Sequence, residues 1–312
     1  MRIIIVGLIA FAFLPALAEA KTYQEMFHRP APTMQDGLLS TLDFREDKLP
    51  LPAAYAALNP AQDFYYLDAV DAVKVLTKLW GNPPEVANGV LGMVFPRQMP
   101  PEDPQAWGAT IDYSDDGYVA DTDAQTIDYD KVLSDLQQQT EEDNVERKTK
   151  GYEPIKLVGW ASPPHYDGSL HALHWARDLL FGTDMNAPHT LNYQLRILGR
   201  QGILEVNFIA GMDQLRTIET QVPRVAGLVA YDADKKYEAH EEGDKLAAYG
   251  LAGLIATAVG AKVAAKVGLL AIALVFLKKG AVVIAVLAGA IFKPIAKLFK
   301  RKPTQPPPYD SA

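Results

Sequence analysis

Residues 112–123, which read DYSDDGYVADTD, align with the twelve-position loop that wraps a calcium ion in EF-hand proteins. In that alignment Asp112, Asp116 and Asp123 supply carboxylate oxygens at the first, fifth and twelfth positions. Gly117 occupies the sixth position, where the loop must turn sharply. These three aspartates are therefore the candidate metal ligands, and calcium is the candidate cofactor.

The same residues also fit a simple turn. The twelfth position of a calcium loop takes a glutamate that binds through both oxygens, and Asp123 is one carbon shorter. An EF-hand has a helix on each side of its loop, whereas residues 107–113 alternate as a strand does. Asp116 and Gly117 form a common turn dipeptide. A calcium loop and a turn between two short strands both remain open for residues 112–123.

Other chemistry is sparse along the chain. His171 and His174 would share one face of a helix, as a zinc pair requires. Leu173 and Trp175 instead keep the two-residue period of a strand, which sends the two histidines to opposite faces. The chain has no cysteine, no Gly-x-Ser-x-Gly elbow and no glycine loop that cradles phosphate. The sequence supports no particular reaction and leaves open whether the protein is an enzyme.

The best-specified structural unit is a hairpin over residues 191–208. Apolar and polar residues alternate on both sides of the Gly-Arg-Gln-Gly loop at 199–202. Closing the chain on that loop predicts one apolar face, which pairs Ile197 with Leu204, Leu195 with Val206 and Tyr193 with Phe208. It predicts a polar face that pairs Arg196 with Glu205 and Gln194 with Asn207.

Further helices and strands flank this hairpin. Asp68 predicts the start of a helix that runs to Trp80, with Val70, Val73, Leu76, Leu79 and Trp80 on its buried face. Asp128 predicts the N-cap of a second helix. Strands are expected at 107–113, 155–161 and 170–180, and another helix near 211–221. The predicted fold class is α+β, an antiparallel sheet with helices packed against it, followed by a C-terminal transmembrane helical segment.

Residues 1–20 predict a secretory signal peptide. Arg2 gives a positive start, an apolar run follows, and small residues stand at the two positions that a signal peptidase reads, Ala18 and Ala20. The apolar run is too short for a comfortable membrane span. The expected mature chain therefore begins at Lys21.

Residues 245–292 predict a membrane anchor. Residues 246–261 are uncharged, and Lys262 and Lys266 can extend their ammonium groups to the far interface. The tail at 293–312 is basic and then proline-rich, and basic flanks stay in the cytoplasm. One crossing thus places residues 21–244 outside the membrane and the tail in the cytoplasm. A two-span hairpin, over about 250–265 and 268–292, is the alternative.

Charge separates the same two parts. Residues 245–312 hold ten of the 30 Lys and Arg and one of the 38 Asp and Glu, a net charge of +9 that leaves −17 for residues 1–244. So acidic a body is not expected to bind nucleic acid. Within the anchor, small residues recur every fourth position at Ala252, Ala256, Gly260 and Ala264, a pattern that favours helix–helix self-association.

Several segments carry a family resemblance. They are LWGNPP (79–84), LGMVFP (91–96), DDGYVADTDA (115–124), LVGWASPPHYD (157–167), LHWA (173–176) and LNYQLRILGRQGILEVNFIA (191–210). With these segments the sequence resembles the bacterial membrane-anchored family catalogued as domain of unknown function 2167, over most of residues 50–300. The resemblance implies an exported, membrane-anchored protein of unassigned activity, and it supplies no catalytic residues.

Two functions are expected from these features. The first is a non-enzymatic envelope interaction module, anchored in the lipid bilayer, whose acidic body binds an unknown envelope protein. The alternative is an envelope enzyme or a calcium-dependent binding domain centred on residues 112–123, with His165 nearby.

Overall fold

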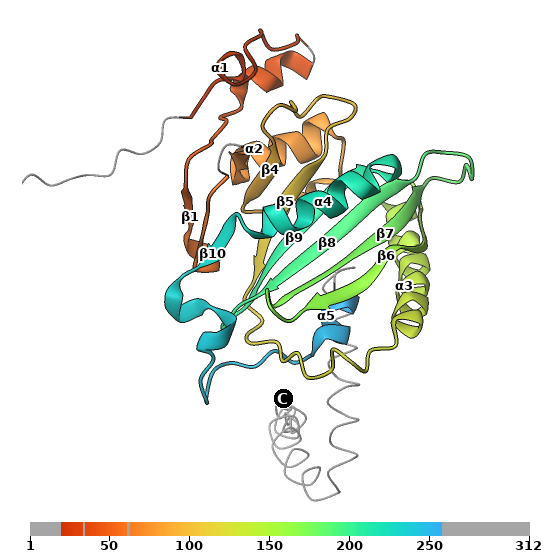
Figure 1. Ribbon diagram of the computed structural model, residues 1–312. Coiled ribbons are helices and arrows are strands. Elements are labelled where there is room, and N and C mark those ends of the chain that lie inside the picture. Colours follow the sequence, from red (N-terminus) through yellow and green to blue (C-terminus); the bar gives the residue numbers. More distant parts are fainter. Residues whose placement is uncertain (1–19, 34, 61–62, 258–312) are drawn as a thin grey trace, which may run out of the picture.

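The computed structural model describes residues 20–33, 35–60 and 63–257. At its centre lies a seven-stranded, fully antiparallel sheet of order β3-β4-β5-β9-β8-β7-β6 (Figure 1). Its strands are β3 (Phe64–Asp68), β4 (Gly92–Pro96), β5 (Gly108–Ser114), β6 (Ile155–Asp167), β7 (Ala172–Phe181), β8 (Thr190–Leu198) and β9 (Ile203–Gly211). A second sheet, of order β1-β2-β10, consists of β1 (Leu49–Leu51), β2 (Ala56–Leu58) and β10 (Val229–Tyr231).

Helices cover both faces of the large sheet, which confirms the predicted α+β class for the described residues. The longer ones are α3 (Tyr129–Thr149) and α4 (Leu215–Ala226), and the shorter ones are α1 (Tyr23–Phe27), α2 (Ala69–Lys74) and α5 (Leu251–Thr257). Short 3₁₀ and π-helical segments complete the set: η1 (Gln35–Thr41), η2 (Pro52–Ala54), η3 (Val75–Leu79), η4 (Pro84–Ala87), η5 (Met212–Gln214), η6 (Ala233–Lys235) and η7 (Tyr237–Ala239).

The two faces of the large sheet differ in what covers them. Figure 1 shows α4 crossing one face over β8 and β9, and Ile218, Val222 and Val225 of this helix belong to the apolar cluster there. We call this the α4 face. The opposite face, here the α3 face, is covered by α3 beside β6 and by α5, through a second cluster that includes Leu136 and Leu254. A third cluster, around Phe44 and Phe95, closes the β3–β4 end.

The hairpin formed by β8 and β9 confirms the predicted register. Ile197 pairs with Leu204, Leu195 with Val206, Tyr193 with Phe208, Arg196 with Glu205 and Gln194 with Asn207. The turn closes between Gly199 and Gly202, where the N–H of Gly199 donates to the carbonyl of Gly202 at 2.9 Å. The apolar pairs lie on the α4 face and are buried there, so the polar pairs must lie on the α3 face.

The helix that begins at Asp68 has a different buried face from the predicted one. Asp68 caps it as expected, since its carboxylate accepts from the N–H groups of Val70 and Asp71. However, Val70 is 66% exposed and Val73 is 39% exposed, so their predicted burial is wrong. After Lys74 the chain makes the π-helical turn η3, which adds a residue to the turn and rotates the apolar positions. Leu76 is buried as predicted, and Leu79 and Trp80 pack half-buried against the same cluster. Ala72 and Val75 are buried in place of Val70 and Val73.

The other predicted elements are present. Asp128 caps α3, where its carboxylate accepts from the N–H of Lys131 at 2.9 Å. The strand expected at 107–113 is β5, those expected at 155–161 and 170–180 are β6 and β7, and the helix expected near 211–221 is α4.

The C-terminal part of the described chain packs against the body. Leu251, Leu254 and Ile255 of α5 are at most 1% exposed, so the first turns of the predicted anchor belong to the packed core. Within residues 20–257, apart from positions 34, 61 and 62, no helix combines the length and the apolar character that a membrane crossing needs. The predicted signal peptide, the remainder of the anchor and the tail at 293–312 lie outside the described residues, and the membrane crossing stays a prediction.

Candidate functional site

A stripe of polar side chains crosses the α3 face at the centre of the large sheet. It runs between the apolar cluster at the β3–β4 end and the cluster that holds α5. Four of its members are buried, with exposures between 3 and 9%. The stripe consists of Thr110 and Asp112 from β5, Glu205 and Asn207 from β9, Asn192, Gln194 and Arg196 from β8, and Arg177 from β7. Buried polar groups in the middle of a sheet lower the stability of the fold. Such a cost is typical of a functional site.

At one end of the stripe an arginine lies between carboxylates. Arg196 forms an ion pair with Glu205 at 3.0 Å, and its guanidinium lies 5.5 Å from the ring centroid of Trp175. Asp112 lies near both groups: burial and, second, the charge of Glu205 raise its pKa to about 6. At pH 7 Arg196, Glu205 and Asp112 together therefore carry one positive and two negative charges.

The other end of the stripe holds a cation without a counter-ion. Arg177 is 9% exposed, and its Nε and Nη2 atoms both donate to Oδ1 of Asn192, at 3.2 and 2.6 Å. No carboxylate in the described ranges forms an ion pair with Arg177, and its Nη1 donates to none of their atoms. Burial and the nearby charge of Arg196 lower the pKa of Arg177 to about 10. The guanidinium is therefore still charged at neutral pH.

Three amides line up beside Arg177. Asn192 donates from Nδ2 to Oδ1 of Asn207 at 2.6 Å, and Gln194 donates from Nε2 to Oδ1 of Asn192 at 2.7 Å and also to Oδ1 of Asn207. Oδ1 of Asn207 accepts from both Asn192 and Gln194, so the amide nitrogen of Asn207 points away from the network. It donates to no group in the part of the chain that the structure describes.

A cavity of about 500 Å³ opens above these residues, between α3 and the sheet. Arg177, Asn192 and Asn207 contribute polar atoms to its lining. Its apolar lining is Leu157, Leu179, Phe181 and Ile209, and charged residues of α3 and η4 line it as well, among them Arg147, Lys150, Glu146 and Glu85. This volume lies within the range of sites for small organic molecules.

The sequence of α3 explains why the cavity exists. The helix is polar along most of its length, and Leu136 is its buried residue. Further along, the side chain of Asn144 holds the helix to β6, donating to the carbonyl of Ile155 and accepting from its N–H, both at 2.8 Å. A helix held at the sheet edge by polar contacts leaves the space over the central strands unfilled.

The structure separates the three predicted metal ligands. Asp112 belongs to the polar stripe, whereas Asp116 is exposed and accepts from the hydroxyl of Tyr249. Asp123 accepts from the N–H groups of Leu251 and Ala252, at 3.1 and 3.2 Å, and so caps α5. Among the described residues no group of three or more His, Cys, Asp or Glu side chains is placed to hold a metal ion. Calcium binding stays a prediction for titration to test.

Arg177 was not among the predicted site residues, although the sequence carries a signal for it. Leu173, Trp175 and Leu179 share one face of the predicted strand at 170–180, and Arg177 interrupts that apolar phase. A charged residue in the apolar phase of a strand is typical of either an edge position or a functional site. The two-residue period that separates His171 from His174 also marks Arg177.

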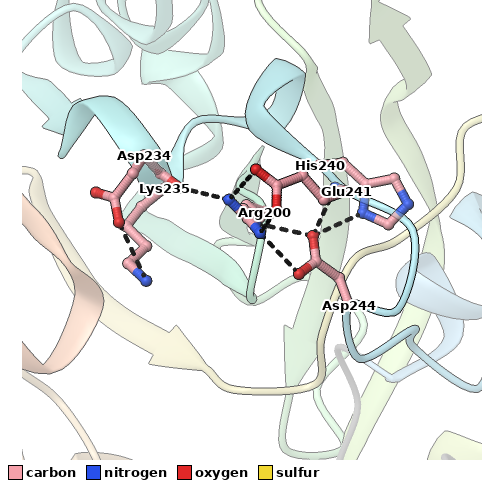
Figure 2. Close-up of polar contacts among 6 residues, drawn as sticks. All are labelled: Arg200, Asp234, Lys235, His240, Glu241 and Asp244. Carbon is pink, nitrogen blue, oxygen red and sulfur yellow. Dashed lines mark hydrogen bonds and ion pairs between the residues drawn. The ribbon is translucent and has the colours of Figure 1, made fainter.

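A second polar cluster fixes the chain that leads to α5. Residues 232–250, which we call the strap, pass the turn of the β8–β9 hairpin, where Arg200 lies between the strap's two ends (Figure 2). Arg200 pairs with Asp244 at 2.8 Å and with Glu241 at 3.1 Å. Nδ1 of His240 donates to Oδ2 of Asp244 at 3.1 Å. These contacts hold the strap against the sheet.

Stacked rings reinforce the same attachment. The ring of Tyr118 lies 3.8 Å from that of His240 and 4.5 Å from that of Tyr237. Tyr237 in turn stacks on His171 at 4.3 Å, so His171 serves the strap. His174 lies elsewhere, beside Tyr193, with 2.9 Å between its Nδ1 and the tyrosine hydroxyl. The zinc pairing considered for these two histidines is therefore not formed.

The fold and this site can be compared with known proteins. The large antiparallel sheet with helices on both faces places the chain among α+β proteins. The chain belongs to the family described as "Protein of unknown function (DUF2167)", whose model matches residues 43–289. No curated protein matches the sequence. A solved structure with some similarity is the solution structure of cyanobacterial PsbP (CyanoP) from Synechocystis sp. PCC 6803, with 12% identity, a TM-score of 0.34, and coverage of 60% of this chain and 92% of that chain.

Proposed function

We propose that the protein is an exported, membrane-anchored binding module of the bacterial envelope, and that the cavity over Arg177 is its ligand site. The observation that carries this proposal is the buried, charged guanidinium of Arg177, which faces a cavity and has no ion-pair partner among the described residues. An unpaired buried charge costs on the order of several kcal/mol. Such a cost is typical of a functional site, where a ligand supplies the missing partner.

Binding accounts for the lining better than catalysis does. The lining presents the buried guanidinium of Arg177, which has no ion-pair partner among the described residues, and it includes no histidine or cysteine in those ranges. The hydroxyl of Thr140 is already used, since it donates to the carbonyl of Leu136 at 2.8 Å. A nucleophile held against a base, as covalent catalysis needs, is not part of the described lining.

The proposed location follows from the ends of the sequence. A signal peptide at 1–20 would export residues 21–244 to the periplasm, and a crossing within 245–292 would hold the chain in the inner membrane. The basic tail at 293–312 would stay in the cytoplasm. Because α5 packs on the body directly before residue 258, the body would stand close to the bilayer.

Self-association remains part of this proposal. Ala252 and Ala256 lie on α5 and are half-buried, whereas Leu251, Leu254 and Ile255 turn toward the core. The first two members of the small-residue stripe are thus not on the face that packs against the body. Gly260 and Ala264 lie outside the described residues. A second copy or an unknown envelope protein would contact this stripe.

The location is tested by protease accessibility. Protease added to intact spheroplasts should digest the body while a tag placed after Ala312 stays protected. A digested tag together with a protected body would contradict the proposed orientation.

The binding site is tested by filling the cavity. The full chain, purified in detergent, is heated with and without the small-molecule filtrate of an envelope extract, because a bound ligand raises the unfolding temperature. Leu179→Trp places an indole in the lining, and Val145→Trp, on the exposed side of α3, is the matched control. We expect the filtrate to stabilise the wild type and Val145→Trp and to leave Leu179→Trp unchanged. Equal stabilisation of both variants, or none of the wild type, would contradict the proposal.

A further inference from the structure

The geometry points to the class of ligand: we propose that the cavity binds a small organic acid through one carboxylate, which pairs with the free edge of the Arg177 guanidinium. This inference rests on the proposed function, because it names the chemistry of the ligand in the same cavity.

The free edge follows from how Arg177 is held. Its Nε and Nη2 atoms both donate to Oδ1 of Asn192, which occupies one edge of the planar guanidinium. The remaining edge consists of Nη1 and the second hydrogen of Nη2. Two parallel N–H groups at such an edge match the two oxygens of a carboxylate. Asn192 thus fixes the orientation of the guanidinium and leaves its other edge available.

The neighbouring amide adds a third donor. Oδ1 of Asn207 accepts from Asn192 and from Gln194, and this fixes the amide with its nitrogen directed away from both. Asn207 lines the cavity as Arg177 does. Arg177 and Asn207 therefore present donors to the cavity, and a ligand carboxylate, which only accepts hydrogen bonds, fits them.

The charges limit the ligand to one negative group. Arg196 is paired with Glu205, and Lys150 lies 3.4 Å from Glu85 and 3.3 Å from Glu146. Arg177 is therefore the buried cation of the lining that has no ion-pair partner among the described residues.

The other charged lining residues are two cations, Arg147 and Lys150, and three carboxylates, Glu85, Asp143 and Glu146, with a net charge of −1. Arg147 donates to the carbonyl of Glu153 at 2.8 Å and lies over the ring of Tyr152, while Asp143 accepts from Gln139 at 2.8 Å. A dianion such as phosphate would add a second negative charge beside these carboxylates.

The apolar part of the lining indicates that the remainder of the ligand is apolar. Leu157, Leu179, Phe181 and Ile209 provide apolar walls beside the polar floor. A volume of about 500 Å³ accommodates a small organic molecule and excludes a protein segment with tertiary structure. An aliphatic or aromatic acid satisfies both the polar floor and the apolar walls.

The test compares acids with their neutral amides. The probes are benzoate and benzamide, butyrate and butyramide, and inorganic phosphate, titrated calorimetrically into the full chain in detergent at constant ionic strength. A hydrogen-bonded ion pair in a buried site supports a preference of about tenfold or more. We expect each acid to bind at least about tenfold more tightly than its amide and more tightly than phosphate.

Variants assign that preference to Arg177. In Arg177→Gln we expect the ratio between acid and amide to fall to about one, and in Arg177→Lys we expect part of it to return. Arg216→Gln, which removes an exposed charge from α4 on the opposite face of the sheet, is the matched control and should retain the ratio. Cooperative thermal unfolding of each variant shows that it is folded.

The possible failures are distinguishable. If an amide binds as tightly as its acid, or if phosphate binds most tightly, the carboxylate inference is wrong and the binding function stands. If the envelope filtrate stabilises the wild type while no acid binds, the inference is again wrong. If neither the filtrate nor any probe binds, the proposed function fails with it.

Discussion

Arg200, in the turn between β8 and β9, donates from Nε and Nη2 to the two carboxylate oxygens of Asp244, at 2.8 and 3.0 Å. The pair joins the most regular part of the sheet to the strap at 232–250. Both side chains are largely buried, with 16 and 14% of their area exposed. The bidentate contact therefore determines where the chain that leads to α5 leaves the body.

Acid should release this strap. Hydrogen bonding from Arg200 lowers the pKa of Asp244 to about 2, below the unfolded value of about 3.9. The pair thus stabilises the fold above about pH 4, and this contribution is lost as the pH falls through about 2. The N–H groups of Tyr118 and Ala247 form hydrogen bonds between the strap and residue 118. We expect the protection factors of these two amides against hydrogen exchange to fall over that pH range.

Asp244→Asn should show the same low protection factors already at pH 7, and acidification should not lower them further. Asp135→Asn, which breaks the exposed pair with Lys131, is the matched control and should leave both amides protected. Protection of Tyr118 and Ala247 in Asp244→Asn at neutral pH would show that the pair does not hold the strap.

Asp112 should make stability depend on pH in the opposite sense. Burial and the charge of Glu205 raise its pKa to about 6, so between about pH 4 and 6 the folded state binds more protons than the unfolded state. Stability therefore falls as the pH rises through this range. Asp112→Asn removes the charge and should raise the free energy of unfolding at pH 8 by about 2 kcal/mol.

The pH profile is the check on this prediction. Urea unfolding at pH 4 and pH 8 should show the gain of Asp112→Asn at the higher pH and little difference at the lower. The exposed Asp116 provides the control, since Asp116→Asn should follow the wild-type profile at both values. Equal gains for Asp112→Asn at the two pH values would contradict the raised pKa.

The hairpin and the site differ in how far sequence determines them. The register of β8 and β9 follows from alternation, because two strands joined by a four-residue turn have few ways to pair and a slip would bury Arg196 and Glu205 on the apolar side. The caps at Asp68 and Asp128 follow from local hydrogen bonding. The buried face of the helix after Asp68 did not follow, because a single π-helical turn rotates it.

The ligand site depends on contacts between strands, and the spacing of residues along the sequence does not show which strands pair. Arg177 lacks a counter-ion because β7 pairs with β8 and places it opposite Asn192, whereas Arg196 has one because β8 pairs with β9. The cavity depends on the distance at which Asn144 holds α3 from the sheet. The sequence indicated a polar face, and only the strand order shows which charge on that face is unpaired.

Removing the cap of α5 should loosen the end of the body. Asp123 accepts from two N–H groups in the first turn of this helix, and losing such a cap costs about 1 kcal/mol. Asp123→Ala should therefore destabilise the protein by about that amount and speed amide exchange in α5. Asp128→Ala, which removes the cap of α3, is the comparison and should speed exchange in α3 instead. Faster exchange of α3 in Asp123→Ala would contradict the assignment.

The two buried arginines of the stripe should respond oppositely to the same substitution. Arg177→Met removes a buried charge with no ion-pair partner among the described residues, and replacing such a charge by an apolar side chain of similar length should stabilise the protein by about 1–2 kcal/mol. Arg196→Met leaves Glu205 without its partner and should destabilise it by about 1–3 kcal/mol, since Glu205 is partly exposed. Urea unfolding of the two variants at pH 7 measures both effects. Because Arg177→Met should also lose the preference for acids over amides, a gain in stability would accompany a loss of binding. Destabilisation by both substitutions to the same extent would mean that Arg177 contributes to folding as Arg196 does, and that the charge in the cavity needs no ligand to explain it.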